Sequence, residues 1–266
     1  MPQIHPTAIV APGAVLAEDA VIGPYCIVGD GVRLGAGVVL RAHVVADGRT
    51  TIGDGTRIFP FASIGLEPQD LKYQGEASSL VVGRNNTIRE YVTMNPGTAG
   101  GGMVTRVGDN GLFMVGVHIA HDCQIGDGVV MANNATLGGH VVIGDHAVLG
   151  GLSAVHQFVR IGRHAMIGGM SGIERDVIPY GQVMGDRARL TGLNIIGMQR
   201  RGFSREDIQG LRNAYQCLFA ADGTLNDRIN ETAERFGEIA PVADILAFIR
   251  ADSSRAICQP KGTNGG

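Results

Sequence analysis

Aliphatic residues recur at every sixth position along most of the chain. They form one run from Ile4 to Ile64, a short run from Val82 to Met94, and a long run from Val107 to Ile173. A six-residue period fits neither a helix nor an alternating strand. It is typical of short parallel strands wound into a triangular prism, with one aliphatic side chain per face pointing inward. We therefore predict an all-β solenoid in which three hexads form one coil of about eighteen residues.

The hexads disappear near residue 185, and helical spacing replaces them. Ser204 precedes an acidic turn and is a typical helix N-cap, and we expect Gly223 to end that helix. Two further helices are predicted over residues 225–236 and 242–249. The sequence thus predicts a β-helix domain over residues 1–185 and a small C-terminal helical domain over residues 186–266.

The hexad register is broken twice, at about residues 66–81 and 96–106. Insertions in solenoids often line the binding face, although tolerated surface loops are the alternative. The first insertion contains Gln69-Asp70-Leu71-Lys72-Tyr73, a compact set of charged and polar side chains that favours a binding role. The second insertion is rich in glycine and carries no such signal.

Composition narrows the possible partners and compartment. A net charge of −3 gives no reason to expect nucleic acid as a partner, and no apolar run approaches the ~18 residues of a transmembrane segment. The four cysteines lack CxxC spacing and are typical of thiols in a reducing compartment. Because the repeat begins at Ile4, no signal sequence is expected, and we predict a cytoplasmic protein.

Histidines gather where the register is regular. Ile119 is an inward anchor, so His118 and His121 lie on either side of it. One coil length further on, Gly139-His140 should lie beside His121, and another coil length places His156-Gln157 above them. This column would supply a base, hydrogen-bond donors and a backbone amide at the spacing of adjacent strands.

Three interpretations of these histidines compete. They are surface residues, or zinc ligands as in γ-class carbonic anhydrases of the same fold, or a general base with its neighbours. The carbonic anhydrases use an HxxxxH pair, whereas His118 and His121 are separated by two residues and His140 and His146 by five. We therefore expect no metal. A neutral imidazole with a pKa near 6.5 suits a general base at cytoplasmic pH.

Several longer motifs carry a closer resemblance. The segments HIAHDC, ANNATLGGH, VHQF, QDLKY and GLNIIGMQRRGFS resemble the acyl-carrier-protein–UDP-N-acetylglucosamine O-acyltransferases. These hexapeptide-repeat transferases begin lipid A synthesis and have a left-handed parallel β-helix fold. The resemblance covers nearly the whole chain. The enzyme that adds the later N-linked chain has a domain before its repeats, whereas here the repeats start at Ile4.

The resemblance implies transfer of an R-3-hydroxyacyl chain from acyl carrier protein to the 3-OH of UDP-N-acetylglucosamine, with no cofactor. His121 matches the general base, Asp122 the carboxylate that orients it, and the Gly139 N–H the donor to the thioester carbonyl. Gly169 matches the end of the acyl groove, which limits chain length. The residues that match substrate-binding positions are Asp70, Lys72, His118, His140, Gln157, Asn194, Arg200 and Arg201.

The family also implies a closed homotrimer with sites between subunits. Because the carrier protein is acidic, we expect a basic docking patch, for which Arg160, Arg163 and His164 are candidates. On the residues alone, Arg200 and Arg201 could equally be the solvated start of a helix.

Two departures leave the acceptor open. The best-known members have His-Arg at Asn95-Pro96 and an acidic residue at Ile196. An acceptor with a 3-amino group is therefore an alternative. A CoA-dependent hexapeptide acyltransferase and a catalytically silent solenoid also remain as alternatives.

Overall fold

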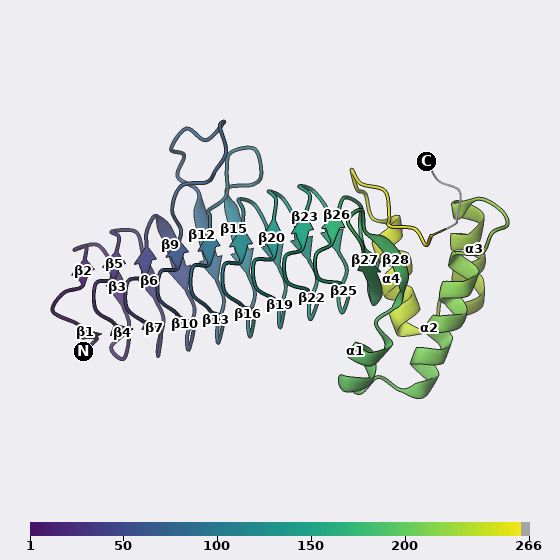
Figure 1. Cartoon of the computed structure of the whole chain (residues 1–266), viewed down its shortest axis with the longest axis horizontal. Helices are drawn as coiled ribbons and strands as arrows, with labels where there is room; N and C mark the ends of the chain where they lie inside the picture. The colour runs from purple at the N-terminus through teal and green to yellow at the C-terminus, as the bar shows by residue number, and fades with distance from the viewer. Residues whose placement is uncertain (262–266) are drawn as a thin grey trace.

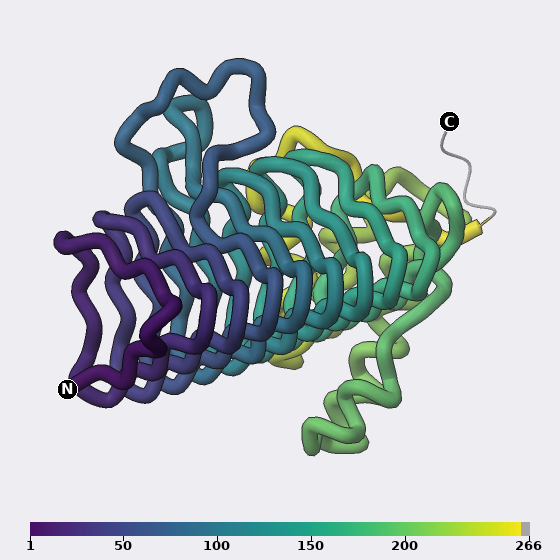
Figure 2. The backbone as a smooth tube through the Cα atoms, turned by 60° about the vertical axis from the view of Figure 1, so that its left-hand side comes forward, coloured from purple at the N-terminus to yellow at the C-terminus, as the bar shows by residue number. Residues whose placement is uncertain are grey.

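The computed structural model describes residues 1–261 and shows a left-handed parallel β-helix followed by a hairpin and four helices (Figure 1). Three sheets form the faces of the prism, and each strand pairs with the strand one coil later in the chain. Viewed closer to its long axis, the chain winds as stacked triangular coils (Figure 2). The predicted fold is confirmed.

The three faces share the same construction from very short strands. The first sheet contains β1 (Gln3–Ile4), β4 (Val21–Ile22), β7 (Val39–Leu40), β10 (Arg57–Ile58), β13 (Thr87–Ile88), β16 (Leu112–Phe113), β19 (Val130–Met131), β22 (Val148–Leu149), β25 (Met166–Ile167), β27 (Gly181–Met184) and β28 (Arg189–Leu193). The second contains β2 (Ile9–Val10), β5 (Ile27–Val28), β8 (Val45–Ala46), β11 (Ser63–Ile64), β14 (Thr93–Met94), β17 (His118–Ile119), β20 (Thr136–Leu137), β23 (Ala154–Val155) and β26 (Gly172–Ile173). The third contains β3 (Val15–Leu16), β6 (Arg33–Leu34), β9 (Arg49–Ile52), β12 (Ser79–Val82), β15 (Val104–Val107), β18 (Gln124–Ile125), β21 (Val142–Ile143) and β24 (Arg160–Ile161).

The aliphatic anchors set the register of the sheets. Leu40 pairs with Ile58, and Ile58 pairs with Ile88 across the first insertion, so the anchors stay aligned when the chain between them lengthens. From Ile22 to Ile173 the anchors are almost fully buried and form one continuous apolar column. Neighbouring positions on the same strands point outward, as Val142 (41% exposed) does beside Ile143 (2% exposed). Burial of the aliphatic anchor in each hexad, together with the small residue two positions before it, therefore drives the winding.

Both insertions leave the prism from the same edge, between β11 and β12 and between β14 and β15 (Figure 2). The strands that follow them begin at Ser79 and Val104, slightly earlier than the hexad spacing indicated. The two loops therefore lie next to one another over the same corner of the prism.

The end of the chain differs in part from the expectation. Residues 189–193, expected in the helical part, form β28, which pairs antiparallel with β27. The helices are α1 (Ile195–Arg200), α2 (Arg205–Leu218), α3 (Leu225–Phe236) and α4 (Ala240–Arg250). Ser204 caps α2 as predicted, but that helix ends at Leu218 with Phe219 as its C-cap, so the expected end at Gly223 was wrong. Within the described residues, none of these helices has the length and apolarity needed to cross a membrane.

Adjacent residues of β21 test the role of the anchors. Ile143→Ala removes a buried anchor and should lower the free energy of unfolding by about 2–5 kcal/mol. Val142→Ala changes the exposed neighbour and should cost less than about 0.5 kcal/mol. Denaturant unfolding of both variants measures this difference, and equal losses would contradict the assignment of inward and outward positions.

Candidate active site

The turns between strands stack into three corners along the prism. The insertion corner contains both insertions and the turns at residues 120–123, 138–141 and 156–159. The helix corner contains the next turns, such as residues 144–147 and 162–165, and the third corner contains residues 150–153 and 168–171. These corners separate the predicted site residues into groups.

A histidine–aspartate pair lies on the insertion corner. His121 Nδ1 is 2.8 Å from Asp122 Oδ2, the His121 side chain is 15% exposed, and the Asp122 side chain is fully buried. Asp122 has a φ of 60°, a left-handed conformation that aspartate tolerates better than most residues. The corner thus turns the carboxylate back toward the ring of the preceding residue. With Nδ1 bound to the carboxylate, Nε2 is the nitrogen that can accept a proton.

Thr98, in the second insertion, donates hydrogen bonds to both oxygens of the Asp122 carboxylate. Its backbone N–H donates to Asp122 Oδ1 (2.9 Å) and its hydroxyl donates to Oδ2 (2.6 Å). Nothing in the sequence singles out Thr98, because the second insertion has no repeat and no charged motif. The glycines around Thr98 were the only indication in the sequence, because glycine lets the backbone approach a side chain closely.

Gly139 lies against the His121 ring with its backbone N–H unpaired. A Cβ at this position would come within 2.5 Å of His121 Cε1 and 2.6 Å of Nε2, so any larger residue would have to displace the imidazole. At the equivalent turn of the helix corner, the Asp127 N–H donates to Asp145 Oδ1 of the next coil (2.9 Å). Among the described residues no acceptor is present for the Gly139 N–H. A free amide donor therefore lies beside the imidazole.

The column of side chains above His121 agrees with the expectation in the coil of His140 but not in the coil after it. His140 N–H donates to the His121 carbonyl (3.0 Å), and the two rings meet edge to face at 5.0 Å. The next ring is that of Phe158, stacked on His140 at 4.4 Å. His156 instead contacts the Arg255 guanidinium at 2.8 Å. The predicted stacking of His156 was therefore wrong, because the corner residue two positions later occupies that place.

The surroundings of the two neighbouring histidines, His118 and His140, favour the neutral form of each ring. Burial lowers the pKa of His118, and the nearby His121 lowers it further. Burial is also the main cause of the lowered pKa of His140. His118 Nδ1 is 2.7 Å from the Thr93 hydroxyl, which fixes its ring on β17. Both rings can therefore offer hydrogen bonds to a polar ligand without adding charge.

The donor set does not favour a metal ion. Ligand atoms of His121, Asp122 and His140 lie within 4.8 Å of one another, as the ligands of a metal ion would. Both Asp122 oxygens already accept hydrogen bonds, from Thr98 and His121. A metal would have to displace these hydrogen-bond donors from a fully buried carboxylate. We therefore still expect no metal here.

The first insertion brings Asp70 and Lys72 toward His140, and both charges act on the pKa of that ring. The loop is tied to the second insertion through Glu76, whose carboxylate accepts the N–H groups of Gln74 (2.8 Å) and Ala99 (2.9 Å). These backbone donors, Ala99 foremost, lower the pKa of Glu76. Glu76 therefore joins the two insertions beside this corner.

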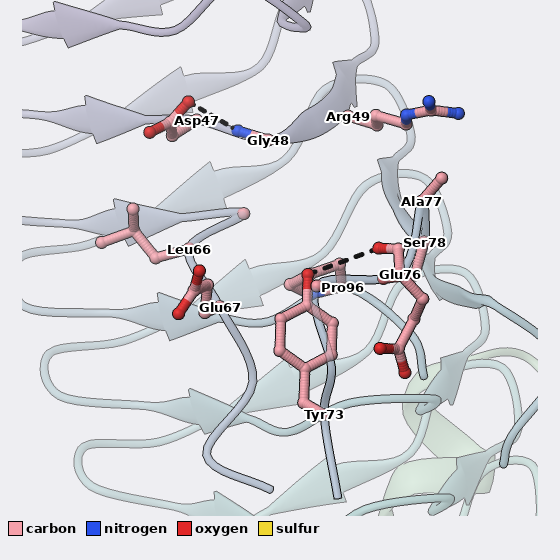
Figure 3. Close-up of a pocket in the computed structure, with 12 residues that line it drawn as sticks. Asp47, Gly48, Arg49, Leu66, Glu67, Tyr73, Glu76, Ala77, Ser78 and Pro96 are labelled. Atoms are coloured by element: carbon pink, nitrogen blue, oxygen red, sulfur yellow. Dashed lines mark hydrogen bonds between the residues drawn. The ribbon is translucent and has the colours of Figure 1, made fainter. Parts of the chain in front are cut away.

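A cavity of about 670 Å³ lies beneath the first insertion, toward the N-terminal coils (Figure 3). Its walls include Asp47, Arg49 and Glu67, and the Tyr73 hydroxyl donates to the Glu76 carbonyl at 3.4 Å. None of the predicted site residues lines it. This cavity is thus distinct from the histidine cluster.

The remaining predicted residues lie on other corners. Asn194 caps α1 and donates to the His164 carbonyl (2.9 Å) on the helix corner. Arg200 is the last residue of α1 and Arg201 is its C-cap, so both are exposed at a helix end and not at a helix start. The α1 helix lies on the opposite side of the prism from the insertions (Figures 1 and 2). Gly169 is on the third corner. One chain does not bring these residues to His121.

The suggested carrier-protein patch is not an exposed basic surface. Arg160 Nε bonds to the buried Asp176 carboxylate (2.7 Å), and its guanidinium packs over Phe248. His164 is 5% exposed, and Arg163 faces Asp244 at 3.4 Å. The docking assignment of Arg160 and His164 was therefore wrong, because both side chains are committed to joining the prism to the C-terminal helices.

Comparison with known proteins supplies independent information. A family model described as "Udp N-acetylglucosamine O-acyltransferase; Domain 2" matches residues 176–258, and a "Bacterial transferase hexapeptide (six repeats)" model matches residues 1–36 and 13–48. The chain is 54% identical over 258 residues to a Caulobacter vibrioides protein named acyl-[acyl-carrier-protein]–UDP-N-acetylglucosamine O-acyltransferase, covering 97% of this chain and 98% of that protein. The structure of LpxA from Acinetobacter baumannii matches with a TM-score of 0.90 and 45% identity, covering 96% and 99% of the two chains. That of UDP-N-acetylglucosamine acyltransferase from Campylobacter jejuni matches with a TM-score of 0.92 and 40% identity, covering 97% and 100%.

His164 gives a prediction for stability against pH. Burial, with smaller contributions from His146 and Arg163, lowers its pKa to about 4 from 6.5. As the pH falls below 6.5, the unfolded chain binds a proton that the folded protein does not bind until about pH 4. Stability should therefore fall over this range, by up to about 3 kcal/mol from this group.

His164→Phe retains a ring that can stack on Tyr180 but removes the titration. Denaturant unfolding between pH 7 and pH 4 should show a flatter pH dependence for this variant than for the native protein. Parallel curves would contradict the assignment.

Proposed function

The chain belongs to the acyl-[acyl-carrier-protein]–UDP-N-acetylglucosamine O-acyltransferase family, and from this premise we propose that it transfers an R-3-hydroxyacyl chain from acyl carrier protein to the 3-OH of UDP-N-acetylglucosamine. This reaction is the first step of lipid A biosynthesis. The observation that carries the proposal is the His121–Asp122 pair beside the unpaired Gly139 N–H. A base and an oxyanion donor on one corner are what acyl transfer requires.

In this mechanism His121 Nε2 removes the proton from the sugar 3-OH as the oxygen attacks the thioester carbonyl. Asp122 holds Nδ1–H and stabilises the imidazolium that forms. The Gly139 N–H donates to the carbonyl oxygen as it becomes negative. Collapse of the tetrahedral intermediate breaks the C–S bond, and the departing thiolate of the carrier arm takes the proton back from the imidazolium. The products are the 3-O-acyl sugar nucleotide and the free carrier thiol.

The sugar would be held by neutral and charged groups around this corner. We assign Asp70, Lys72, His118, His140 and Gln157 to acceptor binding. The lowered pKa values of His118 and His140 support this assignment, because neutral imidazoles donate or accept single hydrogen bonds from sugar hydroxyls. Asp70 and Lys72 act electrostatically at His140, which agrees with a loop that lies over the bound sugar.

We further propose a homotrimer in which neighbouring copies complete each site. Asn194, Arg200 and Arg201 would bind the nucleotide and its diphosphate from a second subunit, because they lie away from the insertion corner of their own chain. Guanidinium groups suit phosphate oxygens. Gly169 on the third corner would mark the end of the acyl groove and leave room for a long chain. Cyclic symmetry closes such an assembly at three copies.

A second candidate for the acyl acceptor is the 3-amino analogue of the sugar nucleotide. Asn95 donates through Nδ2 to the carbonyls of Leu66 (3.0 Å) and Glu67 (3.1 Å), while its buried Oδ1 has no partner. The Asn95 side chain would have to turn for this buried oxygen to accept the additional hydrogen that an amine has and a hydroxyl lacks.

All four cysteines are free thiols, which supports a location in the reducing cytoplasm. The carrier protein would deliver its acyl chain there.

Product analysis tests the reaction directly. The native protein, incubated with UDP-N-acetylglucosamine and a series of 3-hydroxyacyl carrier-protein thioesters, should give an acylated sugar nucleotide detectable by mass spectrometry. His121→Ala should lower the rate by about 10²–10⁴-fold through loss of the general base.

The same assay separates the alternatives. Product only with the 3-amino acceptor would keep the mechanism and change the substrate, and activity with acyl-CoA would identify the other donor. The preferred chain length reports on Gly169. A His121→Ala variant as active as the native protein would reject the general base.

Mixed trimers test whether subunits share sites. His121→Ala and Arg201→Ala should each be nearly inactive alone. Random trimers from equal co-expression should regain about a quarter of native activity, because one site in four combines an intact His121 with an intact Arg201 of its neighbour. No recovery, with mixed trimers shown by differential tagging and mass spectrometry, would place both residues in one chain's site.

A further inference from the structure

The second insertion folds back over the buried carboxylate of Asp122. Thr98 donates to both oxygens, through its backbone N–H to Oδ1 (2.9 Å) and through its hydroxyl to Oδ2 (2.6 Å). Thr98 is itself 4% exposed, so water does not compete for these bonds. The carboxylate is therefore held in one rotational state by a residue 24 positions earlier in the chain.

The shape of the insertion depends on this contact. The Thr98 carbonyl accepts the N–H groups of Gly101 (3.1 Å) and Met103 (3.0 Å), which closes a tight turn. A Cβ at Gly101 would lie 2.0 Å from Asp122 Cγ, and one at Gly97 would lie 2.8 Å from Oδ1. Glycines at both positions let the backbone close around the carboxylate. The loop is thus built around Asp122.

Two imidazoles lie within reach of the same carboxylate oxygen. Asp122 Oδ2 is 2.8 Å from His121 Nδ1 and 4.0 Å from His140 Nδ1. The Asp122 backbone is held separately, because its N–H donates to the Thr105 hydroxyl at 2.7 Å. Only rotation of the carboxylate group would therefore be needed to exchange one histidine for the other, and the Thr98 hydrogen bonds oppose that rotation.

We propose that Thr98 is a positioning residue that directs the Asp122 carboxylate to His121 and away from His140. This inference rests on the proposed function, in which His121 must carry its proton on Nδ1 and leave Nε2 free. Without Thr98 the Asp122 carboxylate hydrogen-bonds to His121 for part of the time and to His140 for the rest. His121 then spends part of its time with the proton on Nε2, where it cannot act as a base.

Spectra of ¹⁵N-labelled histidine in the full-length protein test this directly. At a pH where the rings are neutral, native His121 should show a protonated Nδ1 and a bare Nε2. In Thr98→Val the Nε2-protonated form should appear, and the kcat for acyl transfer should fall about tenfold or more with KM for both substrates within about twofold. Thr98→Ser retains the hydroxyl and should restore both the spectrum and the kcat.

Two further variants separate positioning from general damage. Thr56→Val makes the same change at a buried threonine whose hydroxyl bonds to the Gly83 carbonyl (3.0 Å), and it should alter neither the His121 signals nor the kcat. Adding His140→Phe to Thr98→Val removes the competing ring and should return His121 to the Nδ1-protonated form. If Thr98→Val does not fold, Thr98→Ala carries the same expectations.

Unchanged His121 signals and an unchanged kcat in Thr98→Val would overturn the proposal. The spectra are recorded without substrates, so they judge Thr98 even if the protein proves inactive toward the sugar nucleotide. Failure of the acyl-transfer assay in the native protein would instead count against the proposed function.

Discussion

The burial of an aliphatic anchor in every hexad determines where the other groups of the β-helix lie. Anchors such as Leu40 and Ile58 stack directly above one another, and the strands that carry them pair in register. Because the column is continuous, extra chain must leave the prism at a corner without shifting the coils that follow. The two insertions do so at the same corner, and the anchors on either side remain aligned. The register of the paired strands therefore decides which residues meet at the candidate site.

Backbone hydrogen bonds between coils continue through the corners, but some turn N–H groups, such as that of Asp127, lie outside them. At the helix corner, aspartates of successive coils accept the backbone N–H groups that the strands leave unpaired, as Asp145 does for Asp127. At the insertion corner the equivalent N–H of Gly139 has no such cap, and a histidine ring takes the space beside it. We infer that the absence of an aspartate cap at Gly139 leaves an amide donor free beside His121, whose own partner Asp122 is buried.

The sequence was sufficient for those features that follow from the period. It predicted the solenoid, the anchors, the two insertions and the adjacency of His121 and Gly139, because each depends only on counting hexads. It did not predict Thr98, whose contact with Asp122 is made by a loop without a repeat. It also placed His156 in the column that Phe158 occupies, since counting gives backbone neighbours and not side-chain directions. The β27–β28 hairpin was missed because it pairs antiparallel at the end of the repeat.

The role of His121 can be tested in a crystal structure with the bound acceptor sugar nucleotide, by measuring the distance from His121 Nε2 to the sugar 3-oxygen. We predict hydrogen-bond contact at about 2.6–3.2 Å, with the diphosphate meeting α1 of a neighbouring copy. A sugar bound in the cavity beneath the first insertion, or one whose 3-oxygen faces His140 with no contact to His121, would contradict the account.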